Sequence, residues 1–195
     1  GRSVDVRRSD VAGEIIMRRV ATAAAFEALC EGLARRSLIA LDTEFERTDT
    51  FHPRLALLQV FDGEVIHLID PLAVRELDAF APLLADGGLV KVLHSGTEDL
   101  ELLQAVLRVR PEAVHDTQIR EAFVSPDFSL SYRDLAARHA GVTVEKDQTR
   151  SDWLRRPLSE AQLAYAAADV RWLLLAHGNQ ARALVVVFHA DPAFE

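Results

Sequence analysis

Apolar residues follow two different spacings along the first third of the chain. A recurrence every three or four residues predicts a helix over residues 22–35. Downstream, apolar residues form short continuous runs, which are typical of buried strands. Because Asp62-Gly63 separates two of these runs and favours a tight hairpin, the first part of the sheet is expected to be an antiparallel meander. Its strands are predicted at residues 37–45, 55–61 and 64–69.

Helices and strands alternate in the middle of the chain. Ser95 and Glu98 form a capping-box pattern, in which two side chains three residues apart satisfy backbone N–H groups at the start of a helix. A helix is therefore expected to begin directly after the strand that precedes this pair. The elements predicted here are a helix over residues 75–85, a strand over 89–93, the capped helix to about residue 109 and a short strand over 113–115.

The second half of the chain is mostly helical by the same periodicity. Ser159 and Gln162 form another capping box at the start of the last helix, and Gly178-Asn179 is expected to end that helix. The run Val185–Phe188 that follows is β-like. Helices are predicted over residues 116–124, 130–139 and 159–177.

Length and composition fit one globular domain. Of 195 residues, 49% are hydrophobic and 27% charged, which excludes disordered and collagen-like classes. Cys30 is the single cysteine, so a disulfide framework and a cysteine-based zinc site are excluded. No apolar run approaches the ~20 residues of a membrane helix, and we expect a cytoplasmic protein without membrane contact. The expected division is a flexible leader over residues 1–20, one domain over 21–178 and a C-terminal tail without an assigned structure over 179–195.

The charge balance bears on the class of partner. The chain has 22 basic and 30 acidic side chains, which gives a net charge of −8. A generic nucleic-acid-binding protein is expected to be basic, so this balance argues against that class. The argument fails if a share of the acids is gathered in a metal site.

Three separate segments carry acids that can meet at one edge of the sheet. Asp42 and Glu44 are two residues apart in a strand and so share a face. Asp99 lies in the first turn of a helix that follows a strand. Tyr165 and Asp169 share a face of the last helix, among alanines that allow a close approach to the sheet. Taken singly, each feature has a structural explanation: a strand end in water, an acid at the positive end of a helix, or a surface pair.

The four acids together suggest a metal site. Carboxylates gathered in one place repel each other and raise each other's pKa values. Divalent cations remove that conflict, and ligand sets made only of oxygen favour Mg²⁺ or Mn²⁺ over zinc. Two such ions about 4 Å apart stabilise the attacking and leaving oxygens of a phosphodiester. A tyrosine one helical turn before the last acid is suited to orient the attacking water.

Three stretches in order resemble the three motifs of the ribonuclease D family of 3′–5′ exonucleases. They are IALDTEF with the following RTDTFHPRLALLQVFDGE, then HSGTEDLELL, then TRSDWLRRPLSEAQLAYAAADVRWLL. The resemblance covers residues 37–175. It implies an α/β fold of the ribonuclease H-like type, with a five-stranded mixed sheet and helices on both faces.

The resemblance also implies an activity and its residues. A sister group has a histidine five residues before the last acid, where this chain has Ala164, so the tyrosine subtype is implied. The family trims 3′ ends of structured RNA, such as transfer RNA precursors, and releases 5′-mononucleotides. Its longer bacterial members carry helical RNA-binding domains after the nuclease domain; without them we expect a preference for short single strands. The implied ligands of two divalent cations, Mg²⁺ or Mn²⁺, are Asp42, Glu44, Asp99 and Asp169, and the implied catalytic tyrosine is Tyr165.

Six residues are candidates to hold the substrate, and each has a structural alternative. Phe45 is suited to stack on the terminal base or to pack in the core. Gln59 is suited to bond the substrate, a metal ligand or the backbone, and His94 to face the metals or to form a local hydrogen bond. Asp116 is read as a helix cap. In the charged loop, the candidates for phosphate contact or plain solvation are Arg150, Arg155 and Arg156.

Two other functions stay open. A DNA 3′–5′ exonuclease would use the same chemistry, and matched RNA and DNA strands would distinguish it through the 2′-hydroxyl. A catalytically silent nucleic-acid-binding module is the second, and the intact set of acids argues against it. A Mg²⁺ titration that gives neither activity nor a thermal shift would support that module.

Overall fold

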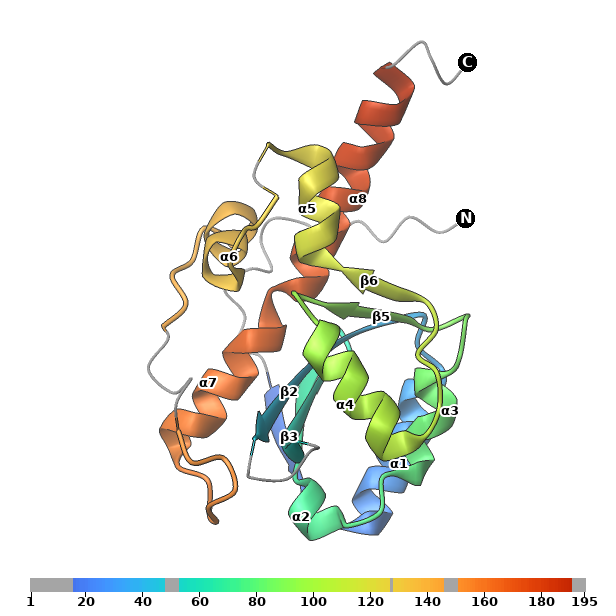
Figure 1. Ribbon diagram of the computed structural model, residues 1–195, viewed down its shortest axis with the longest axis vertical. Helices are drawn as coiled ribbons and strands as arrows, with labels where there is room; N and C mark the ends of the chain where they lie inside the picture. The colour runs from blue at the N-terminus through green and yellow to red at the C-terminus, as the bar shows by residue number, and fades with distance from the viewer. Residues whose placement is uncertain (1–15, 48–52, 127, 146–150, 191–195) are drawn as a thin grey trace.

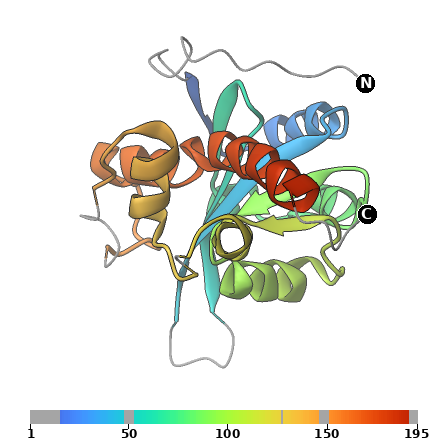
Figure 2. The same ribbon diagram turned by 90° about the horizontal axis from the view of Figure 1, so that it is seen from above.

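The computed structural model describes residues 16–47, 53–126, 128–145 and 151–190. Its centre is one six-stranded mixed sheet in the order β1-β4-β3-β2-β5-β6, with helices on both sides (Figure 1, Figure 2). The predicted α/β class with helices on both faces is confirmed, with one strand more than expected. The strands are β1 (Ile16–Val20), β2 (Leu38–Glu46), β3 (Arg54–Phe61), β4 (Val65–Ile69), β5 (Val90–Leu93) and β6 (Val114–Asp116).

The predicted antiparallel meander is confirmed. β2 pairs with β3 and β3 with β4, both antiparallel, while β5 and β6 extend the sheet in parallel beyond β2. The expected leader over residues 1–20 is wrong at its end, because β1 pairs in parallel with β4. Val20 is the one buried residue of this edge strand, so β1 lacks the apolar pattern by which a strand is predicted.

Two clusters of buried side chains lie on opposite faces of the sheet. One joins α1, α3 and α4 to Leu41 of β2, and the other joins α6, α7 and α8 to Ala40. Because successive strand residues point to opposite faces, Asp42 and Glu44 lie on the α7 face and Thr43 on the α4 face. The helices are α1 (Ala23–Leu33), α2 (Pro71–Val74), η2 (Asp78–Phe80), α3 (Ala81–Leu84), α4 (Thr97–Leu107), α5 (Thr117–Val124), α6 (Tyr132–Ala140), α7 (Glu160–Arg171) and α8 (Leu173–Ala190).

Two helix starts differ from the prediction. The helix expected over 75–85 is divided into η2 and α3, and Pro82 stands in the first turn of α3. Proline has no backbone N–H and cannot continue a helix from the preceding turn. The capping box at the start of α4 is also wrong, since Gly96 occupies the N-cap position. The Asp116 carboxylate accepts the backbone N–H groups of Ser95 and Gly96 instead, at 3.0 Å each.

The last predicted helix consists of two helices, α7 and α8, that meet at Trp172. The Tyr132 hydroxyl donates to the carbonyl oxygen of Ala168 at 2.5 Å and accepts the backbone N–H of Trp172 at 3.3 Å. It therefore stands where the hydrogen bond between these two backbone groups would lie in a continuous helix. Insertion of a side chain into this ladder is a known cause of helix kinks.

The C-terminal helix is longer than predicted. α8 continues through Gly178-Asn179, and the β-like run Val185–Phe188 is helical, so the predicted helix end before Gly178 and the β-like interpretation of this run are both wrong. Tertiary contacts outweigh the tendency of Gly178 to end the helix. The buried Gln180 amide donates to the Thr117 carbonyl at 2.8 Å and to the Glu121 carboxylate at 2.7 Å. Figure 1 shows α8 extending past the sheet alongside α5. Within the described residues, no helix combines the length and apolarity needed to span a membrane.

Candidate active site

The predicted acids come together where β2, α4 and α7 meet. One carboxylate oxygen from each of Asp42, Glu44 and Asp169 lies within 4.8 Å of the others. Asp99 approaches from α4, where its carboxylate accepts a hydrogen bond from the Thr43 hydroxyl. The negative charge of Asp99 acts on both Asp42 and Glu44, which places it as the fourth member of the cluster.

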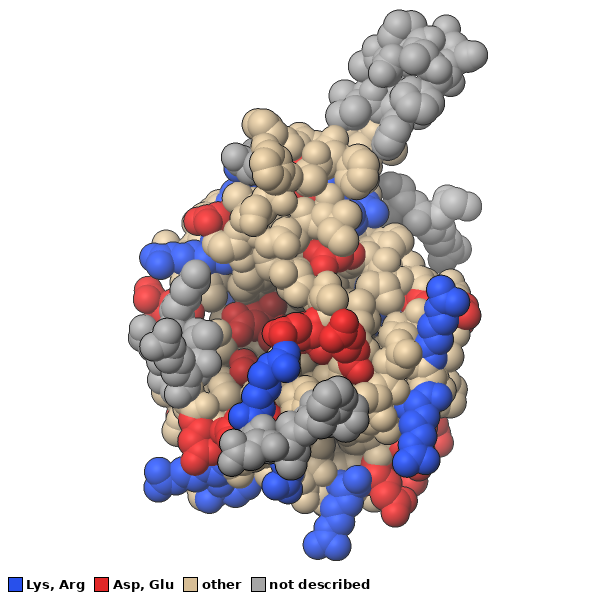
Figure 3. All heavy atoms as spheres, in the orientation of Figure 1, with Lys and Arg blue, Asp and Glu red and all other residues tan. Residues whose placement is uncertain are grey.

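Local structure explains why the acids converge. Because successive strand residues point to opposite faces, Asp42 and Glu44 lie on the same face of β2. The pairing register of β2 with β3 shifts immediately after them, between Glu44 and Phe45. On α7, the buried Leu163, Ala166 and Val170 pack against the sheet. The small alanine side chain allows the helix to approach closely, so Asp169 reaches the acids of β2. Figure 3 shows acidic side chains gathered in and beside a hollow on this face of the molecule.

Burial raises the pKa values of all four acids, and repulsion by neighbouring acids of the cluster raises those of Asp42 and Glu44 further. Burial, followed by the charges of Asp169 and Asp99, raises the pKa of Glu44 to about 8. Burial raises the pKa of Asp169 to about 7, although a hydrogen bond from Tyr165 lowers it. The pKa of Asp42 lies well above its usual range because of burial and the neighbouring acids, and burial also raises that of Asp99.

This electrostatic state fits a divalent cation. Carboxylates crowded together without a counter-charge have raised pKa values, whereas a bound cation favours their ionised forms. The ligand set contains only carboxylates, which suits hard cations of the magnesium and manganese type. The described cluster is therefore a candidate metal centre.

Tyr165 stands beside the acids with support from the preceding loop. It lies one helical turn before Asp169 and forms a hydrogen bond with it. The buried Trp153 ring packs 6.0 Å from the Tyr165 ring, centroid to centroid. The backbone N–H of Trp153 donates to the Glu46 carboxylate at 2.9 Å, so the end of β2 holds the loop that packs on the tyrosine.

Gln59 and Phe45 both adjoin the acid cluster. Gln59 is fully buried opposite Asp42, and its amide nitrogen donates to Asp42 at 3.4 Å. Its amide oxygen has no hydrogen-bond partner in the described part of the chain. Phe45 is half-buried against the core on the α4 side, with the Arg47 guanidinium 5.9 Å from the centre of its ring.

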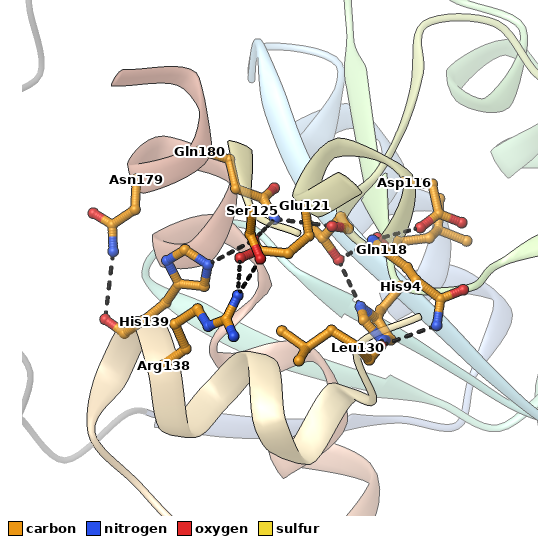
Figure 4. A network of polar contacts seen from close by, with 12 residues as sticks. His94, Asp116, Gln118, Glu121, Ser125, Leu130, Arg138, His139, Asn179 and Gln180 are labelled. Carbon is orange, nitrogen blue, oxygen red and sulfur yellow. Dashed lines mark hydrogen bonds and ion pairs between the residues drawn. The ribbon is translucent and has the colours of Figure 1, made fainter. Parts of the chain in front are cut away.

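His94 is held inside the fold. Its Nδ1 lies 2.9 Å from the Thr117 hydroxyl. Its Nε2 lies 3.0 Å from the Leu130 carbonyl oxygen, and Figure 4 shows the contact between His94 and Leu130. Burial lowers the pKa of His94. Both ring nitrogens therefore have partners within the protein. Of the two roles considered for His94, this geometry agrees with a local hydrogen bond and not with a position facing the metals. Asp116 caps α5 through the N–H groups of Gln118 and Ile119, as predicted.

The arginines of the charged loop separate into different environments. Arg156 binds Asp70 through two nitrogens at 2.7 and 2.8 Å and donates to the Ala56 carbonyl at 2.7 Å, so it anchors the loop to the sheet. Arg155 is exposed. Arg150 lies outside the described residues.

Three residues of the site region carried no signal in the sequence. Thr43 stands between two acids but on the other face of β2, where it bonds Asp99. Arg47 forms an ion pair with Glu98 of α4, next to Asp99. Tyr132 lies far from Asp169 in the sequence. These contacts join separate elements, and spacing along one strand or helix cannot reveal them.

Comparison with known proteins places the chain in a family. The model of the 3′–5′ exonuclease family matches residues 17–179. Ribonuclease D of Cronobacter turicensis is 45% identical over 159 residues, and that of Escherichia coli is 44% identical over 155 residues. These alignments cover 81% and 80% of this chain, but 43% and 41% of the relatives.

Solved structures agree with the sequence comparison. The crystal structure of Escherichia coli RNase D matches with a TM-score of 0.84 at 39% identity, covering 92% of this chain and 48% of that one. Trypanosoma brucei RNase D in complex with RNA U12 matches with a TM-score of 0.75 at 28% identity, covering 87% of this chain and 64% of that one.

The chain belongs to the family of 3′–5′ exonucleases. Within that family, the resemblance to ribonuclease D is confirmed by curated relatives and by a solved structure. The chain spans about two fifths of the length of the curated relatives it matches.

Proposed function

We propose that this chain is a metal-dependent 3′–5′ exoribonuclease domain that releases 5′-mononucleotides from RNA 3′ ends. The observation that carries the proposal is the convergence of Asp42, Glu44 and Asp169 within 4.8 Å, with Asp99 and Tyr165 beside them. The names of the relatives support RNA as the substrate class, as does the RNA-bound structure of a similar protein.

The proposed cofactor is a pair of divalent cations, Mg²⁺ or Mn²⁺, held by the four acids. When bound, such ions activate a water and stabilise charge on the oxygens of the cleaved phosphodiester. The raised pKa values of the acids support this assignment. Burial and mutual repulsion disfavour the ionised carboxylates when no cation is bound, and bound cations would remove that penalty.

The protein's own groups hold and orient the reactants. In the proposed reaction, water attacks the last phosphorus and the bond to the 3′ oxygen breaks, leaving a nucleoside 5′-monophosphate and a shorter RNA with a 3′-hydroxyl. The Tyr165 hydroxyl, already hydrogen-bonded to Asp169, orients the attacking water. The Gln59 amide, on the neighbouring strand β3, donates a hydrogen bond to the Asp42 carboxylate and restrains its orientation.

The proposed substrate is the single-stranded 3′ end of an RNA, including a structured RNA such as a transfer RNA precursor. Phe45 is proposed to stack on the terminal base, since it is half-exposed beside the acids. Arg150 is proposed to contact a phosphate. His94 is assigned to the fold rather than to the substrate, because both of its ring nitrogens are engaged.

The test is digestion of a 5′-labelled RNA in Mg²⁺ or Mn²⁺. A ladder of products shortened one nucleotide at a time from the 3′ end is expected, and Asp42→Asn should abolish it. Glu76→Gln removes a charge from an exposed position on the α2–η2 connection and serves as the matched control.

Three further arms of the assay identify the reaction. A 3′-phosphate on the RNA tests the need for a free terminal hydroxyl. A matched DNA strand digested faster than the RNA would assign the domain to DNA instead. Internal cleavage of a circular RNA, or no cleavage together with no thermal shift in Mg²⁺, would contradict an exonuclease.

A further inference from the structure

We propose that Thr43 is a positioning residue, whose hydroxyl orients the Asp99 carboxylate for cation binding. This inference rests on the proposed function, since it concerns the same acid cluster. Thr43 lies between the two acids of β2. Its proposed role is to orient a ligand and not to bind the cations or to contact the reacting atoms.

The contact lies on the α4 face of the sheet and joins β2 to α4. Thr43 is 6% exposed and points toward α4, away from Asp42 and Glu44. Its hydroxyl donates to Oδ1 of Asp99, and its backbone N–H also bonds the Asp99 carboxylate. One residue of β2 thus fixes the acid that α4 contributes.

This arrangement restrains the orientation of the Asp99 carboxylate. The Thr43 hydroxyl holds Oδ1 of Asp99, which limits rotation of the carboxylate group. Because Thr43 is flanked by Asp42 and Glu44, the backbone of β2 sets the position of Asp99 relative to both acids. Ligands oriented in this way bind metal more tightly, and loss of a supporting hydrogen bond costs about 10–100-fold in affinity.

The test compares variants that differ in the hydroxyl. Thr43→Val keeps the branched shape but has no donor, while Thr43→Ser keeps the donor. Thr117→Val is the matched control, because Thr117 is also buried and its hydroxyl donates to the Leu93 carbonyl at 2.9 Å. Mn²⁺ binding to the substrate-free protein is measured by calorimetry, and folding is checked by circular dichroism.

Thr43→Val should weaken Mn²⁺ binding about 10–100-fold, while Thr43→Ser and Thr117→Val stay within about threefold of the wild type. Wild-type affinity in Thr43→Val would overturn the proposal, and so would an equal loss in Thr43→Ser. If Thr43→Val does not fold, Thr43→Ala is compared with Thr43→Ser by the same criteria.

The outcome is separable from the proposed function. Cleavage of RNA by the wild type with unchanged Mn²⁺ affinity in Thr43→Val would overturn the role of Thr43 alone. Weakened Mn²⁺ binding in Thr43→Val, together with a wild type that cleaves no RNA, would support the role of Thr43 and contradict the exoribonuclease.

Discussion

Replacing Asp169 by asparagine should stabilise the cation-free protein while it removes activity. The substitution keeps the size and hydrogen-bonding shape of the side chain but removes its charge. Asp169 faces Asp42 and Glu44 within 4.8 Å and is half-buried, so its ionised form is unfavourable in the folded state. The same charge is needed to hold a cation, and stability and function therefore change in opposite directions.

The raised pKa sets the size and the pH dependence of the effect. A pKa of about 7 in the folded protein, against 3.8 ordinarily, means that ionisation opposes folding above pH 3.8 and does so fully above pH 7. The full shift corresponds to about 4 kcal/mol, and partial solvent screening lowers the expected gain to about 1–3 kcal/mol. For a chain of this size that is about 2–10 °C in melting temperature.

The assay is thermal unfolding of wild type and Asp169→Asn in a chelator at pH 5 and pH 8. The advantage of the variant should be larger at pH 8, because the wild-type penalty is nearly complete there and only partial at pH 5. Mn²⁺ should then raise the melting temperature of the wild type more than that of the variant. A variant that is less stable than the wild type at pH 8, or a difference that does not depend on pH, would refute this reasoning.

Three other changes test the same structure. Tyr165→Phe should retain the fold and Mn²⁺ binding but lower the single-turnover cleavage rate about 100-fold, as expected for loss of a water-orienting group. In wild-type protein, Mn²⁺ affinity should rise between pH 6 and pH 8.5 in calorimetric titrations, because Glu44, with its pKa raised to about 8, must lose its proton to bind; equal affinity across this range would contradict it. Tyr132→Phe should cost about 1 kcal/mol in urea unfolding, since it removes the hydroxyl between Ala168 and Trp172; an unchanged midpoint would show that the kink does not need it.

Much of the fold follows from patterns within single elements. The buried runs of β2, β3 and β4, and the turn at Asp62-Gly63, are short-range features, and each is predicted close to its observed position. The spacing of Asp42 with Glu44, and of Tyr165 with Asp169, is enough to place each pair on one face of its element. Periodicity suffices here because strand and helix geometry alone decide which way these side chains point.

Other features depend on residues distant in the sequence. β1 is a strand because β4 offers it a free edge, and its own residues are mostly exposed. Arg156 was a candidate for phosphate contact, but its guanidinium is committed to Asp70 and Ala56. The sequence around an arginine does not show which acid it will pair with. The structural role of Arg156 could therefore be assigned only from the tertiary structure.

The amino-acid sequence by itself determined the class of protein, the elements that carry the acids and the face on which each acid lies. The tertiary structure decided how these elements meet: Thr43 of β2 bonds Asp99 of α4, and Tyr132 kinks the helix just after Asp169. The physical reason is the distance along the sequence between the residues that interact. Periodicity reports on neighbours within a turn or a pleat, whereas a buried polar group takes the partner that folding brings to it.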